Sequence, residues 1–352
     1  MNKIAILIPS LKPGGAEKQA SLLALVLSEF YLVDIYLLYG DTDASAENLK
    51  ILNAPNIQIH SLKGNILSKI KQLTQKLRVH QPRALFNYLT SCDVVGAIAG
   101  HLAKVDKIYN GVRNARVEWR KMIADKIVHN HIASGTIFNC YSGAEYFSLK
   151  GFNKKKNIII PNCFMNIANP IVRDDRAVKH IVSVGRFVRQ KDYLTMIRAI
   201  SFLRNMRGDF KLDIIGYGEE ELNIRKWVDE YDINDYVNIY IRPNNVQDIV
   251  QKSDIYISTS LFEGTSNSIM EALNWSLPVV ATDVGDNNCL VKHGDNGMLH
   301  KIGDAESIAQ SLSVLLDSIE LRNKYGLRSN QNLRDNYSMD IFQKRYIEII
   351  NS

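Results

Sequence analysis

Two glutamates in the second half of the chain have a spacing that could serve chemistry. Glu263 and Glu271 lie eight positions apart in FEGTSNSIMEA at residues 262–272, a run that follows an apolar stretch and opens a helical pattern. We expect Glu263 in the turn and Glu271 about two turns into the helix, so that both carboxylates face one ligand at different depths. The residues between them that offer amides and side-chain oxygens are Gly264, Thr265 and Ser266. Such a helix start suits a polyhydroxylated or phosphorylated ligand, although two glutamates at this spacing are also common on solvated helices.

A pair of cations follows another predicted strand. Arg186 directly follows the apolar run at residues 180–185, and Lys191 stands five residues later, before a helical pattern. An arginine can contact two phosphate oxygens at once, whereas a lysine acts as a mobile point charge. Together they suit a diphosphate and could stabilise the charge that grows on a departing nucleoside diphosphate. This spacing alone leaves open the alternative of two solvated surface cations.

Two glycines occupy the first predicted turn. Gly14 and Gly15 separate the apolar run at residues 3–9 from a helical pattern, so backbone amides at the helix start could approach a diphosphate or an acceptor. A dinucleotide-binding enzyme is disfavoured, because the GxGxxG spacing of that class is absent from this turn. Glu17, in the first helical turn, is expected to complement the helix dipole.

The elements that must position these residues alternate between short apolar runs and helical patterns. We expect strands at residues 3–9, 33–38, 84–88, 132–138, 180–185, 210–216, 237–241, 255–258 and 279–282. Helices are expected at residues 18–30, 66–78, 193–203, 219–231 and 268–274, and after Asp93. Continuous apolar runs are typical of strands buried on both faces of a parallel sheet. Each half of the chain therefore predicts a doubly wound α/β domain.

One stretch separates the two halves. Residues 161–176, PNCFMNIANPIVRDDR, contain two prolines and no periodicity, which is typical of an interdomain linker. We therefore predict domains over residues 1–166 and 167–336. Two such domains in tandem create a cleft between the carboxyl ends of their sheets, where ligands bind in such folds.

The composition is that of an ordinary folded protein. Of the 352 residues, 46% are hydrophobic and 23% charged, which argues against disorder. No apolar run reaches the roughly 20 residues of a membrane span, and the start of the chain shows no signal-peptide cleavage site, so we expect a cytoplasmic protein. The four cysteines lie far apart without zinc spacing and are expected to be reduced thiols in the core.

Positive charge is concentrated in the first part of the chain. Residues 1–160 carry 21 Lys and Arg against 11 Asp and Glu, whereas the remainder carries 22 against 26. This basic part indicates an anionic partner, which could be nucleic acid, an anionic membrane surface or a phosphorylated substrate. No nucleic-acid-binding motif is present, so no nucleic acid is expected to bind.

The helix predicted at residues 66–78 has an apolar face. Its members are Ile66, Ile70, Leu73 and Leu77, with basic residues around them. This pattern predicts an amphipathic helix that faces the core. The alternative is that the helix, with the lysines at 154–156 and the basic residues of 113–126, makes a peripheral contact with the anionic inner membrane.

Five stretches together resemble the retaining glycosyltransferases of family 4. They are PSLKPGGAEKQ at residues 9–19, IIIPN at 158–162, VSVGRFVRQKDYLTMIRAI at 182–200, IIGYGEEEL at 214–222 and FEGTSNSIMEALNWSLPVVATDVG at 262–285. They occur in the family's order over nearly the whole chain, and the last carries the family's E-x7-E pair. The resemblance implies the GT-B fold, in which two tandem Rossmann-like doubly wound domains face each other across a cleft. In such proteins the last helix packs back on the first domain, which we expect for residues 337–352.

The resemblance also implies roles for the residues above. Arg186 and Lys191 would stabilise the departing nucleoside diphosphate. Glu271 would accept hydrogen bonds from the ribose hydroxyls, and Glu263 would lie at the donor sugar. The amides of Gly264, Thr265 and Ser266 would bind sugar hydroxyls, and Arg242, with Tyr240, would flank the nucleobase. The family often has glycine after the lysine, whereas this chain has Asp192.

The acceptor side is less defined. Arg113 and Asn114 occupy the region where many family members place a cleft-facing polar residue, often histidine, and are candidates for acceptor or phosphate contacts, with a plain surface turn as the alternative. The eight histidines are scattered, and none stands at ligand spacing from a Cys, Asp or Glu, so no metal site is expected. GT-B enzymes generally work without a bound metal, and no cofactor is expected besides the nucleotide-sugar substrate.

We therefore expect a retaining, metal-independent glycosyltransferase. It would move a hexose or N-acetylhexosamine from a nucleotide sugar, first of all a UDP-sugar, to a glycan or polyprenyl-diphosphate-linked acceptor in cell-surface polysaccharide synthesis. The first domain would bind the acceptor and the second the nucleotide sugar. Two alternatives stay open: a catalytically silent GT-B partner subunit, which the intact site residues disfavour, and a GT-B sugar-nucleotide epimerase, which would convert the donor without an acceptor.

Overall fold

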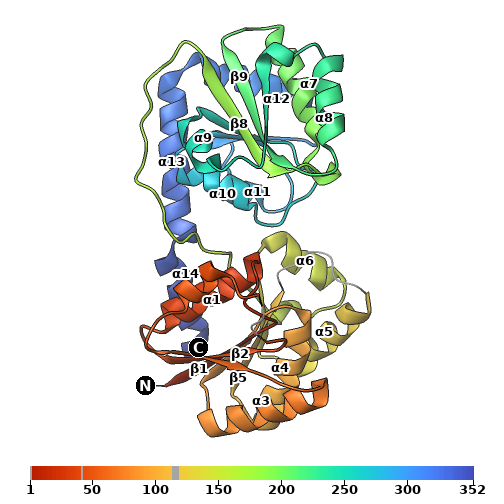
Figure 1. Ribbon diagram of the computed structural model, residues 1–352, viewed down its shortest axis with the longest axis vertical. Helices are drawn as coiled ribbons and strands as arrows, with labels where there is room; N and C mark the ends of the chain where they lie inside the picture. The colour runs from red at the N-terminus through yellow and green to blue at the C-terminus, as the bar shows by residue number, and fades with distance from the viewer. Residues whose placement is uncertain (1, 41–42, 113–118) are drawn as a thin grey trace. The chain divides into compact units, whose positions relative to one another are not determined.

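The computed structural model describes residues 2–40, 43–112 and 119–352 (Figure 1). The chain divides into two compact units, one of residues 1–165 with 339–352, the other of residues 166–338. The predicted domain boundary lies within a residue or two of these limits. No helix in the described part of the chain combines the length and apolarity needed to cross a membrane.

The first unit is built on a parallel sheet. Its described strands follow the order β3-β2-β1-β4-β5-β6-β7, so the order reverses between β1 and β4. The strands are β1 (Lys3–Ile8), β2 (Leu32–Leu37), β3 (Ile57–Ser61), β4 (Ala84–Asn87), β5 (Lys107–Val112), β6 (Gly135–Phe138) and β7 (Asn157–Ile159). The helices are α1 (Gly15–Leu27), α2 (Ala46–Ile51), α3 (Ile66–His80), α4 (Thr90–Ala103), α5 (Trp119–His131), α6 (Tyr141–Leu149) and α14 (Met339–Asn351).

Strand β1 shows why apolar runs form the centre of this sheet. Ile4, Ile6 and Ile8 pack with α1 and α14 on one face, while Ala5 and Leu7 pack with α3 and α4 on the other. Successive side chains of a strand point to opposite faces, so a strand covered on both sides must be apolar throughout.

The C-terminal helix α14 completes the first unit. Phe342, Tyr346 and Ile350 are buried in the same core as α1, and the Tyr109 hydroxyl donates to the carbonyl of Ile349 at 2.7 Å. Figure 1 shows α14 beside α1, although more than 300 residues separate them in the sequence.

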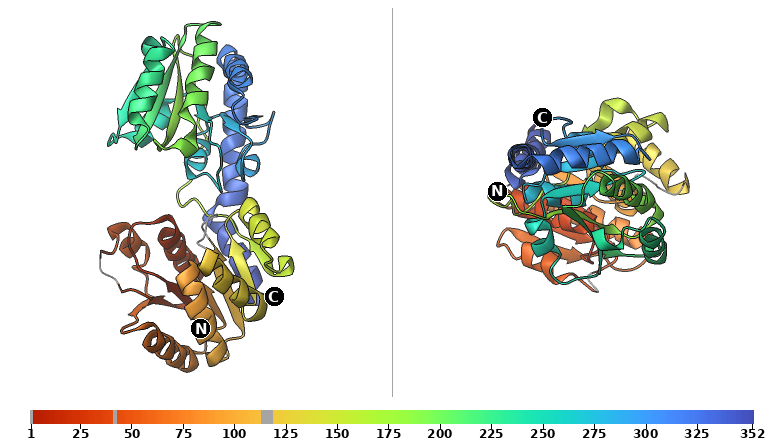
Figure 2. Two further views of the ribbon diagram at one scale, coloured as in Figure 1. Left: turned by 90° about the vertical axis from the view of Figure 1, so that its right-hand side faces the viewer. Right: turned by 90° about the horizontal axis from the view of Figure 1, so that it is seen from above.

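The second unit is also a parallel sheet, in the order β10-β9-β8-β11-β12-β13 over its described strands. The strands are β8 (Lys179–Arg186), β9 (Phe210–Tyr217), β10 (Val237–Ile241), β11 (Ile255–Ser258), β12 (Val279–Thr282) and β13 (Gly297–His300). The helices are α7 (Tyr193–Arg204), α8 (Glu221–Glu230), α9 (Val246–Lys252), α10 (Asn267–Asn274), α11 (Asn287–Leu290), α12 (Ala305–Asp317) and α13 (Ile319–Tyr337). The left view of Figure 2 shows α8 and α13 on opposite sides of this sheet. Both units therefore have Rossmann-like strand order.

The predicted linker is attached to the second unit from residue 166 onward, whereas its first residues belong to the first unit. The guanidinium of Arg173 donates to the carbonyls of Ser253 at 2.7 Å and Ser276 at 2.8 Å, and the amide of Ala168 donates to Asn274 at 2.7 Å. Residues 161–176 form no helix or strand, as their composition predicts. The hydrogen bonds of Ala168 and Arg173 nevertheless fix this segment against the second unit.

Three local expectations differ from the structure. The strand expected from residue 132 begins at Gly135, because α5 continues to His131. The apolar face of α3 is buried at Leu73 and Leu77, whereas Ile66 in the first turn is 48% exposed. Cys289, expected in the core with the other cysteines, is only half-buried, because the one-turn helix α11 buries Asn287 and Leu290 instead.

Candidate functional site

The candidate site lies at the carboxyl edge of the second sheet, where the strand order reverses between β8 and β11. Loops leaving neighbouring strands in opposite directions open a crevice at such a reversal. The loop after β8 carries Lys191, and the loop after β11 carries Glu263. The order of the strands therefore brings together two residues that are 72 positions apart.

Lys191 and Glu263 form an ion pair. The ammonium Nζ donates to the carboxylate Oε1 at 2.6 Å, and the Ser260 hydroxyl donates to the same oxygen at 2.8 Å. The side chains are 19% exposed for Lys191 and 10% for Glu263. A charge-assisted bond of this length, largely shielded from water, fixes both charged groups at the edge of the sheet.

Hydrogen bonds connect the loop after β11 to the loop after β8 and to strand β12. On the β8 side, the Thr259 hydroxyl donates to the carbonyls of Lys191 and Asp192, at 3.1 and 2.9 Å. On the β12 side, the Thr282 hydroxyl donates to the carbonyl of Ser260 at 2.6 Å. Glu263 therefore extends from a loop whose backbone is positioned from two sides.

The conformation of Asp192 accounts for aspartate, rather than glycine, directly after Lys191. Its backbone is left-handed, with φ 45° and ψ 56°, a conformation that favours glycine but that aspartate also tolerates. Its carboxylate accepts hydrogen bonds from the Thr195 amide at 3.3 Å and the Thr195 hydroxyl at 2.6 Å. Aspartate at this position therefore caps α7 directly after Lys191, which glycine could not do.

Two glycines leave room for the ion pair. A β-carbon at Gly185 would lie 3.3 Å from Cε of Lys191, within tight contact. Gly285 has φ +55°, and a β-carbon there would lie 2.0 Å from the carbonyl oxygen of Glu263. Any side chain at Gly285 would therefore displace the loop that carries the glutamate.

A buried tyrosine lies on β11, the strand that leads into the loop with Glu263. Tyr256 of β11 is 1% exposed, and its hydroxyl donates to the carbonyl of Val184 at 3.2 Å. Burial raises the pKa of Tyr256 well above its usual value, and the negative charges of Glu271 and Glu263 raise it further. Glu271 is half-buried on α10, beyond the amide-rich turn at Gly264, Thr265 and Ser266.

The remaining second-unit candidates lie on neighbouring strand ends. Arg186 is the exposed last residue of β8. Arg242 follows β10 with φ 46°, and its guanidinium lies over the ring of Tyr217, 4.1 Å from the centroid. The Arg242 amide donates to the carbonyl of Gly216 at 3.2 Å. Both arginines therefore stand at the same edge of the sheet as Lys191.

The first-unit candidates are less defined. Gly14 and Gly15 are exposed where α1 begins, and a β-carbon at Gly15 would meet no atom within 4 Å. Their roles stay predictions. Arg113 and Asn114 lie outside the described residues.

Sequence reasoning missed two groups of residues. The first comprises the side chains that position Glu263 and its loop, namely Thr259, Ser260 and Thr282. Three successive hydroxyl residues at 258–260, directly after a buried strand, were the available signal. The second group is in the first unit, where Asp34, His60 and His80 come together although none stands at ligand spacing in the sequence.

Comparisons with known proteins show what the chain is similar to. Residues 172–331 match the family described as "Glycosyl transferases group 1". An uncharacterized glycosyltransferase of Haemophilus influenzae is 31% identical over 167 residues, which cover 46% of this chain and 47% of that protein. The chain thus spans about half the length of that relative.

Two further similarities extend over nearly the whole chain. The N-acetylgalactosamine-N,N'-diacetylbacillosaminyl-diphospho-undecaprenol 4-alpha-N-acetylgalactosaminyltransferase of Campylobacter jejuni is 25% identical over 356 residues, covering 92% of this chain and 93% of that one. The crystal structure of Anabaena Alr3699/HepE in complex with UDP covers 100% of both chains with a TM-score of 0.80 and 16% identity. With the two Rossmann-like sheets, this likeness shows that the fold is of the GT-B class.

Proposed function

We propose that the protein is a retaining glycosyltransferase that moves a hexose or N-acetylhexosamine from a UDP-sugar to a glycan or polyprenyl-diphosphate-linked acceptor. The observation that carries this proposal is the 2.6 Å ion pair of Lys191 and Glu263 at the strand-order reversal of the second sheet. A cation and a carboxylate held side by side suit a ligand that has a diphosphate next to a sugar. The match of residues 172–331 to a glycosyltransferase family supports the same assignment.

Lys191 and Arg186 would act on the leaving group, which is the nucleoside diphosphate. When the bond between the anomeric carbon and the diphosphate oxygen breaks, negative charge grows on the diphosphate. Lys191, held in place by Glu263, and Arg186, exposed at the end of β8, would neutralise that charge. Groups already oriented before the reaction need no reorganisation as the charge develops, and this lowers the barrier.

The two carboxylates contact different parts of the donor, one the ribose and the other the sugar. Glu271 accepts hydrogen bonds from the ribose hydroxyls, since one carboxylate can bind two adjacent hydroxyls. Glu263 lies at the sugar, where it orients the ring and stabilises positive charge at the anomeric carbon. The leaving phosphate helps to deprotonate the acceptor on the face it departs from, which gives retention of configuration.

Two relatives support the choice of substrates. The Anabaena structure contains UDP, which favours a uridine diphosphate donor here. The name of the Campylobacter enzyme describes transfer of N-acetylgalactosamine to a diphospho-undecaprenol-linked sugar, which favours an acceptor of that class in cell-surface polysaccharide synthesis. An anionic lipid-linked acceptor also suits the excess of Lys and Arg in residues 1–160 and a peripheral position at the inner membrane.

A donor-binding screen tests the proposal. The purified protein is titrated with UDP-, GDP- and ADP-sugars by calorimetry and thermal shift, because a ligand of the native state raises the melting temperature. We expect saturable binding of a UDP-sugar, weakened about 10–100-fold in Glu271→Ala because a charged hydrogen-bond acceptor is lost. Glu306→Ala, an exposed glutamate on α12, is the matched control and should bind normally. No binding across the panel would instead favour a silent subunit.

Turnover assays separate the roles of the residues. Arg186→Ala should lower kcat by about 100–1,000-fold with a smaller change in donor affinity, while Arg198→Ala, an exposed arginine on α7, should leave both unchanged. Equal losses in kcat and affinity would contradict the leaving-group role. Conversion of the donor sugar without acceptor would indicate an epimerase, and a product of inverted anomeric configuration would exclude retention.

A further inference from the structure

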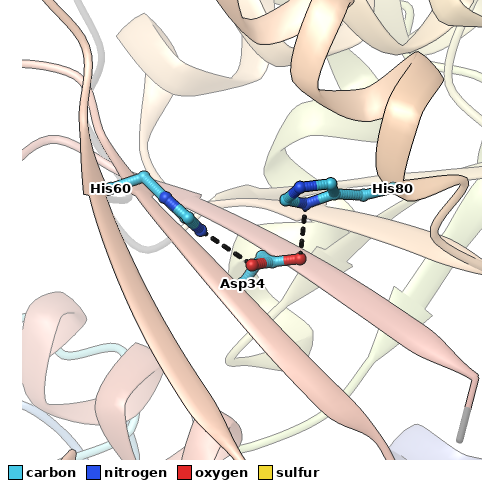
Figure 3. Close-up of side chains that lie close together, drawn as sticks. All are labelled: Asp34, His60 and His80. Carbon is cyan, nitrogen blue, oxygen red and sulfur yellow. Dashed lines mark hydrogen bonds and ion pairs between the residues drawn. The ribbon is translucent and has the colours of Figure 1, made fainter.

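Three side chains of the first unit point toward one another. Asp34 lies on β2, His60 on β3, and His80 is the last residue of α3 (Figure 3). The carboxylate of Asp34 bonds both rings, with Oδ1 at 2.7 Å from Nε2 of His60 and Oδ2 at 2.8 Å from Nδ1 of His80. The donor atoms of all three residues lie within 4.8 Å of one another.

Burial makes this arrangement depend on a positive charge. The side chain of Asp34 is 5% exposed, whereas those of His60 and His80 are each 20% exposed. A shielded carboxylate is costly without a compensating cation. Among the described residues, the ammonium of Lys3 also forms an ion pair with it, at 3.8 Å from Oδ2. The partly exposed rings leave a route by which an ion can reach the carboxylate from solvent.

The hydroxyl of Tyr36 adds a further constraint. The buried ring of Tyr36 stacks on His60 with centroids 5.1 Å apart, and its hydroxyl lies 3.1 Å from Nδ1 of His80. This nitrogen thus has two oxygen neighbours, although it offers only one proton or one lone pair. A cation that takes the lone pair would leave the hydroxyl free to bond a carboxylate oxygen, as outer groups do around metal ligands.

We propose that Asp34, His60 and His80 bind a divalent cation of the zinc type. Two imidazole nitrogens and one carboxylate oxygen are a donor set that Zn²⁺ uses, with water in the fourth position. A tetrahedral ion about 2.1 Å from its ligands holds them about 3.4 Å apart. With one carboxylate oxygen as ligand, the hydrogen bond from that oxygen must open by about 0.7 Å, while ligand atoms that now lie up to 4.8 Å apart must move closer together. Small side-chain rotations on a rigid sheet can supply that movement.

The ion would serve the architecture of the first unit. It would join β2, β3 and the end of α3, three segments that span residues 34–80. The ligands belong to a different unit from Lys191 and Glu263. The inference is therefore independent of the proposed transfer reaction, and either can fail without the other.

Zinc titration of the full chain tests the inference. The protein is stripped with a chelator, transferred to chelator-free buffer and titrated with ZnCl₂ by calorimetry and thermal unfolding. We expect one Zn²⁺ per chain and, at free Zn²⁺ 100 times the Kd, an approximately 100-fold rise in the ratio of folded to unfolded protein. His60→Gln and His80→Gln should each weaken binding by more than about 10-fold, since even outer-shell changes cost that much. His101→Gln, an exposed histidine on α4, should bind as the wild type.

Three results would overturn the inference: absence of saturable 1:1 binding, an unchanged Kd in His60→Gln, or equal stabilisation by Mg²⁺, which prefers oxygen ligands. A measurement on the wild type keeps the test valid if the variants do not fold. Crystals soaked in ZnCl₂ should give an anomalous peak at the zinc edge between the three side chains. A peak confined to other histidines would show that the cluster is only a hydrogen-bonded support for Asp34.

Discussion

Replacing Lys191 with alanine distinguishes two roles of its ammonium group, neutralising Glu263 and binding the donor diphosphate. The change leaves Glu263 with the Ser260 hydroxyl as its remaining hydrogen-bond donor among the contacts described above. In a pure neutralising role, the variant loses stability but keeps its affinity for UDP. In a diphosphate-binding role, UDP affinity and turnover fall as well.

The expected loss of stability follows from distance and exposure. At 2.6 Å, two unit charges attract by about 6 kcal/mol at an effective dielectric constant of about 20, and desolvation offsets much of that. Exposed pairs contribute about 0.2–1 kcal/mol, and breaking a fully buried pair costs about 3–5 kcal/mol. With side chains 19% and 10% exposed, we expect a loss of about 2 kcal/mol. For a unit of this size, that lowers the melting temperature by about 4–8 °C.

The assay measures stability, UDP affinity and kcat on one set of variants. For Lys191→Ala we expect UDP binding weakened about 10–100-fold and kcat lowered about 100–1,000-fold. Glu263→Gln should retain UDP binding, because it leaves the lysine charge in place and lies at the sugar. Lys252→Ala, an exposed lysine on α9, is the control and should match the wild type in all three measurements.

One result would refute the reasoning. If Lys191→Ala melts at a lower temperature but binds UDP with the wild-type Kd, the lysine is only the counterion of Glu263. The double variant Lys191→Ala with Glu263→Gln would then recover stability, because neither charge would remain unpaired. Loss of UDP affinity that persists in the double variant would support diphosphate binding.

Three further predictions follow from single positions. Gly285→Ala should lower the free energy of unfolding by about 2–4 kcal/mol and reduce kcat, because its β-carbon would lie 2.0 Å from the carbonyl oxygen of Glu263; a wild-type urea midpoint would contradict this. Asp192→Ala should be about 1 kcal/mol less stable than Asp192→Gly in urea titrations, since both lose the cap but only alanine is strained at φ 45°. Burial raises the pKa of Asp125 from 3.8 to about 7. The folded state then keeps a proton that the unfolded state loses, so stability should fall from about pH 4 to pH 7, and Asp125→Asn should flatten that slope in urea titrations.

Strands buried on both faces were the elements easiest to predict. The runs at β8, β9, β11 and β12 were expected within a residue or two of their bounds, because a strand covered by helices on both sides is apolar at every position. Strand β3 was missed, since it lies at the edge of its sheet and its residues are exposed or half-buried.

Helix α13 was missed for a different reason. Its buried residues include Arg322, Ser329 and Asn330, so its inward face does not read as an apolar stripe. These polar groups are compensated by partners far away in the sequence: the Arg322 guanidinium donates to the carboxylate of Asp175 at 2.5 Å, and the Asn330 amide donates to the carbonyl of Asn274 at 2.9 Å. Burial that depends on remote hydrogen bonds leaves no local periodicity to detect.

Local periodicity was enough to predict which residues end the strands and begin the helices of the candidate site, because it depends only on neighbouring positions in the chain. It placed Lys191 and Glu263 each at such a boundary. Their ion pair could not be predicted in this way, because it requires β8 and β11 to be neighbours in the folded sheet although the two residues are 72 positions apart. The same holds for the cluster around Asp34. Its carboxylate contacts His60, which is 26 positions away in the sequence, and His80, which is 46 positions away. Parallel strands are joined by helices that cross over the sheet, so strands that are adjacent in the sheet can be far apart in the sequence. The spacing of residues along the chain does not encode which strands become adjacent.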